Sequence, residues 1–250
     1  MNSIPVWREE TRVKAYEADF AGFWKPATFF QVMTAAASEH AAQLGYEFER
    51  MMSEGMIWVL SRMKMRFFDF PKIRETVVIE TWPKGVQQKV FFYRDFKVMR
   101  PDGALYALAT SAWVLIDPHV RKMLLPQVFR GRLPDNSGLH AMTDLLEKIA
   151  LPEGMKEVAT LEAGYSAVDV MGHVNNGRYI EWISDCFSLE EYRTQKLESL
   201  QINFNNEVLP GERIVITAVQ NPVDQMEWLF QGSHLANGTK AFEAAWRWCK

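Results

Sequence analysis

The feature that most constrains the fold is an internal repeat. Residues 16–31 (YEADFAGFWKPATFFQ) and residues 165–181 (YSAVDVMGHVNNGRYIE) both contain an Asp-x-x-Gly motif. In both segments the motif precedes a stretch in which apolar residues recur at steps of three and four, the spacing of an amphipathic helix. Self-similarity of this kind predicts two units of the same design. The alternative is one irregular α+β domain.

Both helices have recognisable ends. Pro26 suits the first turn of the first helix and Gly45 suits its end, because proline is favoured just inside a helix and glycine just past it. In the second unit Asn175 or Asn176 is a natural N-cap. The residues expected on the buried faces are Phe29, Met33, Ala36, His40 and Leu44 in the first helix and Tyr179, Ile183, Cys186 and Phe187 in the second.

Strands are expected after each helix. Residues 59–67 alternate with period two, which places Val59 and Ser61 on the same face as Met63. An antiparallel sheet has an apolar face to bury, and the helix is the element that can cover it. We therefore expect an α+β fold of the tandem (double) hot-dog type, each half a long central helix wrapped by an antiparallel β-sheet. The other strand segments are 76–82, 89–99, 104–117, 200–204, 213–219, 227–234 and 240–248.

The join between the halves is expected in VFRGRLPDNSGLH, residues 128–140, which is rich in glycine, proline and polar residues. We expect an N-terminal hot-dog half over 1–130, a linker over 131–155 and a C-terminal hot-dog half over 156–250. Within the linker, residues 141–150 are expected to form a short helix.

Composition excludes several classes of protein. The formal net charge of −3 argues against a nucleic-acid partner, which requires a basic excess. Cys186 and Cys249, the two cysteines, lie outside any disulfide or metal spacing, which suits a reducing compartment and predicts no metal site. The chain start has no secretory pattern, and no apolar run approaches the ~20 residues that span a bilayer. We expect a cytoplasmic protein without membrane insertion.

Polar residues cluster where the second helix begins. Asp169, His173, Asn175 and Asn176 lie within a few residues of the unpaired amides of the first helical turn, which can stabilise a developing oxyanion. Taken singly, each has an ordinary structural explanation: an asparagine that caps a helix, an aspartate in a turn, a histidine in a core. The cluster as a whole predicts a site for chemistry.

A second candidate is Glu207, in NFNNEVLPGE at 203–212. It follows the strand LQINF directly and precedes Val208 and Leu209, so we expect its carboxylate to be partly enclosed. Enclosure would make the carboxylate a stronger base, as suits a general base. The alternative is a solvated turn residue.

These segments resemble the fatty acyl–acyl carrier protein (acyl-ACP) thioesterase family, which includes the plant plastid enzymes and bacterial relatives. DVMGHVNNGRYI (169–180) is similar to the family pattern Asp-x-Asn-x-His-Val-Asn-Asn-x-x-Tyr-Ile, and LQINFNNE (200–207) to a family strand that ends in Glu. In the first half, MIWVLSRMKM (56–65) and TSAWVLI (110–116) resemble family segments. The resemblance covers nearly the whole chain.

The resemblance implies hydrolysis of acyl-ACP thioesters, without a cofactor, by a network of Asp169, His173 and Glu207. Two positions depart from the family. Met171 replaces an asparagine, so a carbonyl-polarising side chain is lost there, and Val208 replaces a cysteine that follows the Glu in plant members. The second departure favours direct attack by water. We expect backbone amides near Val174, Asn175 and Asn176 to polarise the thioester carbonyl.

The first half carries Phe23 where the second carries His173, so we interpret it as the non-catalytic, acyl-binding half. Methionine side chains adapt to varied shapes, so several methionines of the first half, among them Met33 and Met63, are candidates to line an apolar tunnel for the acyl chain. Core packing is the alternative explanation. The expected partner is acyl carrier protein, which is acidic. The sequence leaves open whether the protein forms a homodimer. It also leaves two alternative functions open, an acyl-CoA thioesterase and a non-catalytic acyl-binding hot-dog protein. Candidates for a basic rim are Lys64, Arg66, Arg121, Lys122, Arg130 and Arg132.

Overall fold

The computed structural model describes residues 4–249 and divides into two compact units, Met1–Leu146 and Glu147–Lys250. This division falls inside the segment expected as the linker. Residues 141–150 contain neither helix nor strand, so the expected linker helix is wrong. The buried Asp95 carboxylate instead accepts hydrogen bonds from Ala141 N (2.7 Å) and Met142 N (3.4 Å), and this holds the segment against the first unit in an extended form.

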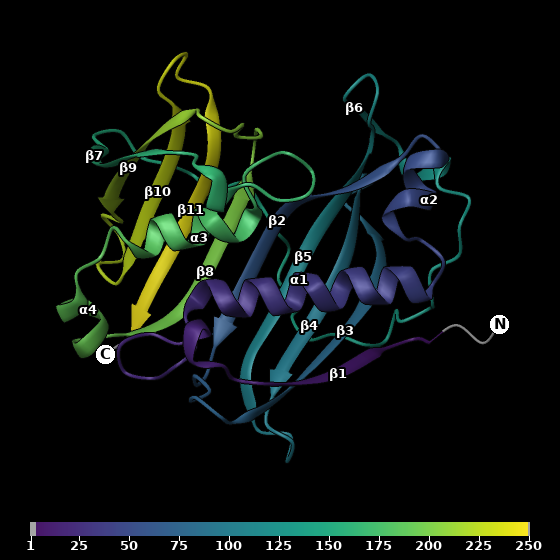
Figure 1. Cartoon of the computed structure of the whole chain (residues 1–250), viewed down its shortest axis with the longest axis horizontal. Coiled ribbons are helices and arrows are strands. Elements are labelled where there is room, and N and C mark those ends of the chain that lie inside the picture. The colour runs from purple at the N-terminus through teal and green to yellow at the C-terminus, as the bar shows by residue number, and fades with distance from the viewer. Residues whose placement is uncertain (1–3, 250) are drawn as a thin grey trace. The chain divides into compact units, whose positions relative to one another are not determined.

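The first unit is an antiparallel sheet covered by one long helix, α1 (Pro26–Gln43) (Figure 1). Its strands lie in the order β1-β3-β4-β5-β2, with β6 paired to the far end of β5. The helix packs on β3 and β1, and Phe29, Met33, Ala36 and His40 of the expected face are buried. The strands are β1 (Trp7–Arg12), β2 (Ile57–Phe67), β3 (Thr76–Gln87), β4 (Phe91–Met99), β5 (Leu105–Asp117) and β6 (Lys122–Leu124), and the short helix α2 (Phe48–Ser53) follows α1.

The second unit repeats this plan with a shorter helix. Its strands lie in the order β8-β11-β10-β9-β7, and helix α3 (Asn176–Ser184) packs its Tyr179 ring against Phe204 of β8 and Phe242 of β11. A further short helix, α4 (Leu189–Thr194), precedes the sheet's first long strand. The strands are β7 (Lys156–Glu162), β8 (Lys196–Phe204), β9 (Arg213–Gln220), β10 (Glu227–His234) and β11 (Lys240–Cys249).

Three features of the sequence interpretation are corrected by the structure. The second helix is not long: it ends at Ser184, so Cys186 and Phe187 lie beyond it, and Ser188 opens α4 through a reciprocal capping box with Glu191. Each unit also begins with a strand, β1 or β7, that precedes its helix. Finally, a bulge between Leu60 and Arg62 shifts the alternation of β2, so Leu60 rather than Val59 or Ser61 shares burial with Met63.

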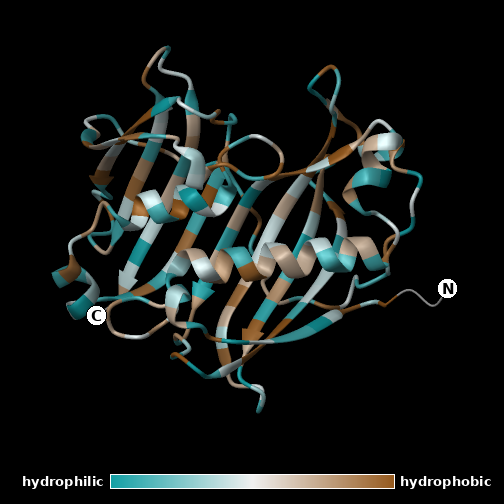
Figure 2. Cartoon of the chain, viewed as in Figure 1, coloured by the Kyte–Doolittle hydropathy of each residue, from teal (hydrophilic) through white to brown (hydrophobic). Residues whose placement is uncertain are grey.

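The expected ends of the first helix are confirmed. Pro26 lies in the first turn of α1, and Gly45 follows its end in the left-handed region, with φ 79°. Figure 2 shows polar and apolar residues interspersed along the strands of both sheets, as expected for sheets with one buried face. Each unit is therefore a helix lying on an antiparallel sheet, the hot-dog arrangement expected from the sequence.

Candidate active site

The polar cluster lies in a tight loop before α3. A short 3-10 helix (Tyr165–Ala167) leads into the loop, which is closed by an antiparallel bridge between Val168 and Val174. Asp169 N donates to His173 O at 2.9 Å, and Gly172 N donates to Asp169 O at 3.0 Å. Gly172 has φ 79°, a conformation that glycine adopts without strain. The Asp-x-x-Gly motif therefore fixes the direction in which His173 leaves the loop.

Asp169 and Asn175 together shape the start of α3. Asn175 is the N-cap, and its Oδ1 accepts a hydrogen bond from Gly177 N at 2.8 Å, as expected. Its Nδ2 donates to Asp169 Oδ2 at 3.4 Å, while Asp169 Oδ1 accepts from Met171 N at 2.9 Å. The Asp169 carboxylate thus orients the capping side chain. Asp169 also contacts His173 through the backbone, where Asp169 N donates to His173 O.

His173 and Glu207 lie together. His173 Nε2 is 3.2 Å from Glu207 Oε2, although the two residues are far apart in sequence. The backbone makes this possible, because Val174 N donates to Val208 O at 2.8 Å and so pairs the segment after His173 with the segment after Glu207. The pair faces solvent: the His173 side chain is 24% exposed and the Glu207 side chain 46%.

The Glu207 side chain, expected to be partly enclosed, is nearly half exposed. Strand β8 ends at Phe204, and Asn205, Asn206 and Glu207 are all exposed before the chain turns inward at Val208. Val208 is fully buried, so the apolar pattern that suggested enclosure describes Val208 alone. An exposed carboxylate beside an imidazole is accessible to water and to a substrate.

The amides near the helix start differ in availability. Val174 N donates to Val208 O, Asn175 N donates to Ala167 O at 2.8 Å, and Gly177 N is capped by Asn175. Among these neighbouring amides in the described chain, Asn176 N has no acceptor. This is the amide of the first helical residue, at the positive end of the helix dipole. Of the three amides expected to polarise a carbonyl, only that of Asn176 is unoccupied.

The other residues expected to bind substrate lie in different environments. Met171 is 38% exposed at the tip of the loop, so it is in contact with solvent rather than with the core. Val174 is buried under the helix start. Met33 and Met63 are both 0% exposed and belong to the core of the first unit.

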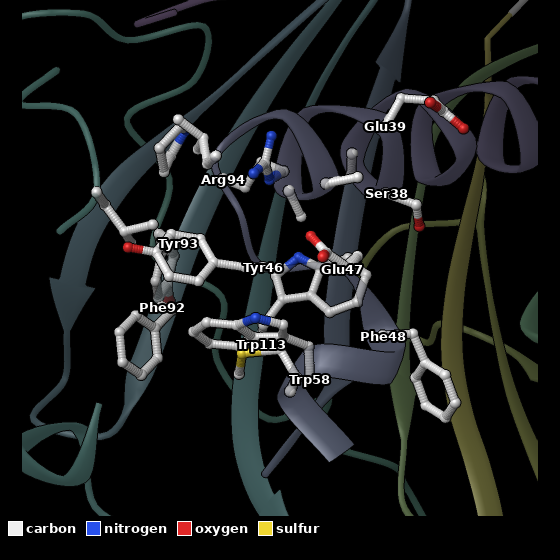
Figure 3. Close-up of a pocket in the computed structure, with 17 residues that line it drawn as sticks. Ser38, Glu39, Tyr46, Glu47, Phe48, Trp58, Phe92, Tyr93, Arg94 and Trp113 are labelled. Atoms are coloured by element: carbon white, nitrogen blue, oxygen red, sulfur yellow. The ribbon is translucent and has the colours of Figure 1, made fainter. Parts of the chain in front are cut away.

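A cavity of about 350 Å³ lies within the first unit, between α1, α2 and the sheet. Met51 is among its lining residues, but Met33 and Met63 are not. Its walls are largely aromatic, and Figure 3 shows rings from β2, β4 and β5 together with Tyr46, which follows α1. Most of these residues were not expected from the sequence, although Trp58 and Trp113 lie in the two first-half segments that carried the family resemblance. The principal aromatic residues are Tyr46, Phe48, Trp58, Phe92, Tyr93 and Trp113.

Cys186 does not have the environment of a nucleophile. It lies just beyond α3, its Sγ donates to Trp182 O at 3.3 Å, and burial raises the pKa of its thiol to about 11. At neutral pH the thiol is therefore protonated, and the thiolate is the reactive form.

Two features are absent from residues 4–249: a metal-binding cluster and a helix that could span a membrane. No group of at least three His, Cys, Asp or Glu side chains is arranged to hold a metal ion. None of the described helices has the length and apolar character needed to cross a bilayer.

The basic side chains considered for a rim belong to the first unit. Lys64 is paired with Asp144 at 2.7 Å. The side chains of Arg66, Arg121, Lys122, Arg130 and Arg132 are exposed.

Comparison with known proteins identifies the family. Residues 5–126 match the acyl-ACP thioesterase N-terminal domain, and residues 152–250 match the acyl-ACP thioesterase C-terminal domain. The chain is 25% identical over 215 residues to a chloroplastic palmitoyl-acyl carrier protein thioesterase of Gossypium hirsutum, covering 81% of this chain and 52% of that protein. It is 23% identical over 221 residues to a chloroplastic oleoyl-acyl carrier protein thioesterase of Coriandrum sativum, covering 80% and 59%. The chain thus spans about half the length of these curated relatives.

Solved structures agree over the whole chain. An acyl-ACP thioesterase from Bacteroides thetaiotaomicron superposes with a TM-score of 0.82 at 25% identity, covering 98% of both chains. The 12:0-ACP thioesterase from Umbellularia californica gives a TM-score of 0.77 at 17% identity, covering 98% of this chain and 97% of that one, and shows the shared fold. The tandem hot-dog fold expected from the sequence is thereby confirmed. Matches to both domains and to these structures show that the chain belongs to the acyl-ACP thioesterase family.

Proposed function

We propose that this protein hydrolyses acyl-ACP thioesters to release free fatty acids and the carrier protein, and so terminates fatty acid synthesis. The observation that carries the proposal is the His173–Glu207 pair, 3.2 Å apart and accessible to solvent beside the start of α3, in a member of this family. Thioester hydrolysis requires a base for water, a donor for the oxyanion and a proton for the leaving thiolate, and residues in this region suit all three tasks.

Glu207 is the general base. Its carboxylate takes a proton from a water molecule as the water oxygen bonds to the thioester carbonyl carbon. The imidazole of His173 holds the carboxylate in place through the 3.2 Å contact. When the tetrahedral intermediate collapses, the C–S bond breaks and the pair returns the proton to the leaving thiolate. A positioned acid–base group of this kind contributes about 10²–10⁴-fold in rate.

Asn176 N stabilises the oxyanion. Its N–H lies at the first helical position with no acceptor in the described chain, where the helix dipole adds to its partial positive charge. Asp169 acts indirectly as a positioning residue, because it orients the Asn175 side chain that caps the same turn. This arrangement needs no donor from the side chain at position 171.

The cavity of the first unit holds the acyl chain. Its aromatic walls and its volume of about 350 Å³ suit an apolar chain, since pockets for small ligands measure about 300–1,000 Å³. The exposed basic side chains Arg66 and Lys122 suit contact with an acidic carrier protein, because long-range attraction steers such partners together. Membership of the acyl-ACP thioesterase family favours acyl-ACP over acyl-CoA as the substrate.

The proposal is tested with the purified protein and thioesters of acyl carrier protein and of CoA at several chain lengths. We expect faster turnover of the acyl-ACP substrates, and a loss of about 10²–10⁴-fold in kcat for Glu207→Gln and His173→Ala. Glu190→Gln, an exposed substitution on α4, is the matched control and should keep full turnover. Full activity in both site variants would refute the assigned site, and a clear preference for CoA substrates would refute the assigned carrier.

A further inference from the structure

The cavity of the first unit contains a buried cation among mainly apolar and aromatic lining residues. Arg94, on β4, lines the cavity and is only 9% exposed. In Figure 3 it lies beneath α1, on the side of the cavity nearest the helix. Burial lowers the pKa of Arg94 to about 10, so the guanidinium remains charged at neutral pH. A buried charge is costly unless an opposite charge compensates it.

No carboxylate supplies this compensation. Arg94 Nη1 is 3.1 Å from His40 Nδ1 and 3.2 Å from Thr81 Oγ1, and within residues 4–249 no acidic side chain pairs with the guanidinium. His40 Nε2 is 2.8 Å from Ile4 O, a carbonyl that can only accept, so Nε2 carries the hydrogen and Nδ1 accepts from Arg94. Burial, with the nearby Arg94 charge, lowers the pKa of His40. Both partners of Arg94 are therefore neutral.

None of the nearby acidic residues among residues 4–249 forms an ion pair with Arg94. Asp95, the next residue, is fully buried and pairs with Lys84 at 3.1 Å. Glu39 and Glu47 also line the cavity, but both are exposed, and Figure 3 shows the Glu39 carboxylate directed away from the other lining side chains. The structure thus contains a compensated buried cation, Lys84, next to an uncompensated one, Arg94, and only the second faces the cavity.

We propose that Arg94 makes this cavity a binding site for an aliphatic chain that ends in a carboxylate. The guanidinium presents several N–H donors in a planar fork that matches a carboxylate, and Nη1 alone is engaged by His40 and Thr81. Tyr46, Trp58 and Phe92 supply apolar walls for the methylene groups. That the chain is an acyl group or its product rests on the proposed function.

Two ligands share this chemistry. One is the free fatty acid, bound with its carboxylate at Arg94. The other is an acyl thioester with a second carboxylate at the far end of the chain, which Arg94 would select as a substrate. Ordinary acyl chains end in a methyl group and gain nothing from the guanidinium.

Direct binding tests the site. Octanoate and octan-1-ol, which differ in the charged end group, are titrated calorimetrically into the full chain at pH 8. We expect the wild-type protein to bind octanoate at least about tenfold more tightly. Arg94→Met should bring the ratio close to one, and Arg94→Lys should retain part of it. Arg8→Met, the same substitution at an exposed residue paired with Glu80, is the matched control and should keep the wild-type ratio.

Equal binding of octanoate and octan-1-ol by the wild-type protein would overturn the proposal without any variant. A folded Arg94→Met protein that keeps the preference would overturn it as well. Hydrolysis rates distinguish the two ligands. If the monothioester of octanedioic acid is turned over faster than the octanoyl thioester, and Arg94→Met removes the difference, the ligand is a dicarboxylic acyl chain. If only the binding of octanoate depends on Arg94, the ligand is the free acid.

The Arg94 site and the proposed function would be refuted by different outcomes. Thioester hydrolysis without any carboxylate preference would refute the Arg94 site alone. Arg94-dependent binding of octanoate without thioester hydrolysis would refute the proposed function alone.

Discussion

The two Asp-x-x-Gly loops have the same backbone. Asp19 N donates to Phe23 O at 2.8 Å and Asp169 N to His173 O at 2.9 Å, while Gly22 and Gly172 have φ 83° and 79°. Antiparallel bridges close both loops, between Ala18 and Trp24 and between Val168 and Val174. This loop is therefore a structural device that both units use, and its presence alone does not indicate catalysis.

The difference lies in side chains at two matching positions. Trp24 N donates to Pro71 O at 3.0 Å, as Val174 N donates to Val208 O, so Phe70 occupies the place of Glu207. Phe70 stacks on Phe67 at 5.2 Å and meets Phe29 edge-on at 5.3 Å. One unit thus has aromatic rings at the two positions, with Lys72 Nζ 5.1 Å from the Phe23 ring centroid, and the other places an imidazole and a carboxylate there. The same scaffold supports packing in one unit and, as proposed, chemistry in the other.

The aspartates of the two loops also differ in the groups that they bind. Asp19 Oδ1 accepts from Ala21 N at 2.8 Å and from Phe23 N at 3.0 Å, so this carboxylate serves the loop. Asp169 makes the first contact, with Met171 N, but its other oxygen accepts from the capping Asn175. Lys25 takes the place of Asn175 in the first unit and forms no side-chain cap. The contact of the aspartate with a helix cap is therefore special to the second unit.

The largest expected effect comes from making the second loop like the first. The double variant His173→Phe/Glu207→Phe should lose about 10²–10⁴-fold in kcat while keeping its melting temperature, because both side chains are partly exposed and the backbone contacts of the loop remain. Turnover and thermal unfolding are measured on the same preparation. Full turnover in a folded double variant would show that the side-chain difference is not the source of activity.

The reverse exchange should cost stability and yield no activity. Phe70→Glu places a carboxylate among the rings of Phe29 and Phe67 and should lower the free energy of unfolding by about 2 kcal/mol or more, as measured by urea denaturation. Phe68→Glu is the matched control, since Phe68 is 55% exposed and should tolerate the change. Equal stability losses in the two variants would contradict a packing role for Phe70.

The aspartates should separate stability from activity. Asp19→Ala leaves two loop amides without their acceptor and should cost about 1–2 kcal/mol in the free energy of unfolding. Asp169→Ala should cost less stability but lower kcat by about tenfold through misplacement of the helix start. Asp169→Asn, which can still accept from Met171 N, should restore part of kcat. Identical behaviour of Asp19→Ala and Asp169→Ala would remove the distinction between the loops.

The first unit also has a buried histidine, His40, and its effect should be on stability. Because burial lowers the pKa of His40, the unfolded state binds more protons near and below the ordinary value of 6.5. The free energy of unfolding should fall as the pH drops from 7.5 to 5.5, by at most about 1.4 kcal/mol per pH unit for this one proton. Urea denaturation at both pH values should show a smaller drop for His40→Gln. An unchanged drop would assign the pH dependence to other groups.

The smallest effect is expected at Met171, where the chain departs from its family. The side chain is exposed and the backbone N–H already serves Asp169, so Met171→Asn should change kcat by less than about threefold. Steady-state kinetics on one acyl-ACP substrate measures the change. A rise of about tenfold or more would show that an amide side chain at this position polarises the carbonyl.

Local patterns predicted the two main helices and most of the long strands in their order, but not β1 or β7. The steps of three and four placed α1, and Pro26, Gly45 and Asn175 marked helix ends, because these residues act on the backbone within one turn. The short helix α3 was harder to predict. Apolar spacing continues through Cys186 and Phe187, which suggested a longer helix. Ser188 and Glu191 instead form a capping box that starts a new helix, and hydrophobic periodicity does not detect such a cap.

Contacts between distant segments were beyond local patterns. The exposure of Glu207 depends on how the chain leaves β8, and the burial of Met33 and Met63 away from the cavity depends on the path of α1 over the sheet. In the sequence, Arg94 and Asp95 are adjacent opposite charges in an otherwise apolar strand segment, FFYRDF, which suggests that they pair with each other. Only the tertiary structure shows that the partners of the Arg94 guanidinium within residues 4–249 are His40 and Thr81 rather than an acidic side chain.

The sequence by itself determined the duplication, the hot-dog class of each half, the family and the residues around which a site had to be sought. These depend on periodicity, on turn and cap preferences and on motif identity, all of which are local. The tertiary structure alone decided that Val174 N pairs with Val208 O and so brings His173 to Glu207, that Asn176 keeps the unoccupied amide, and that Phe70 stands opposite Glu207 in the repeat. The physical reason is that a hydrogen bond between segments far apart in the chain depends on how sheet and loops close, and no short stretch of sequence encodes that closure.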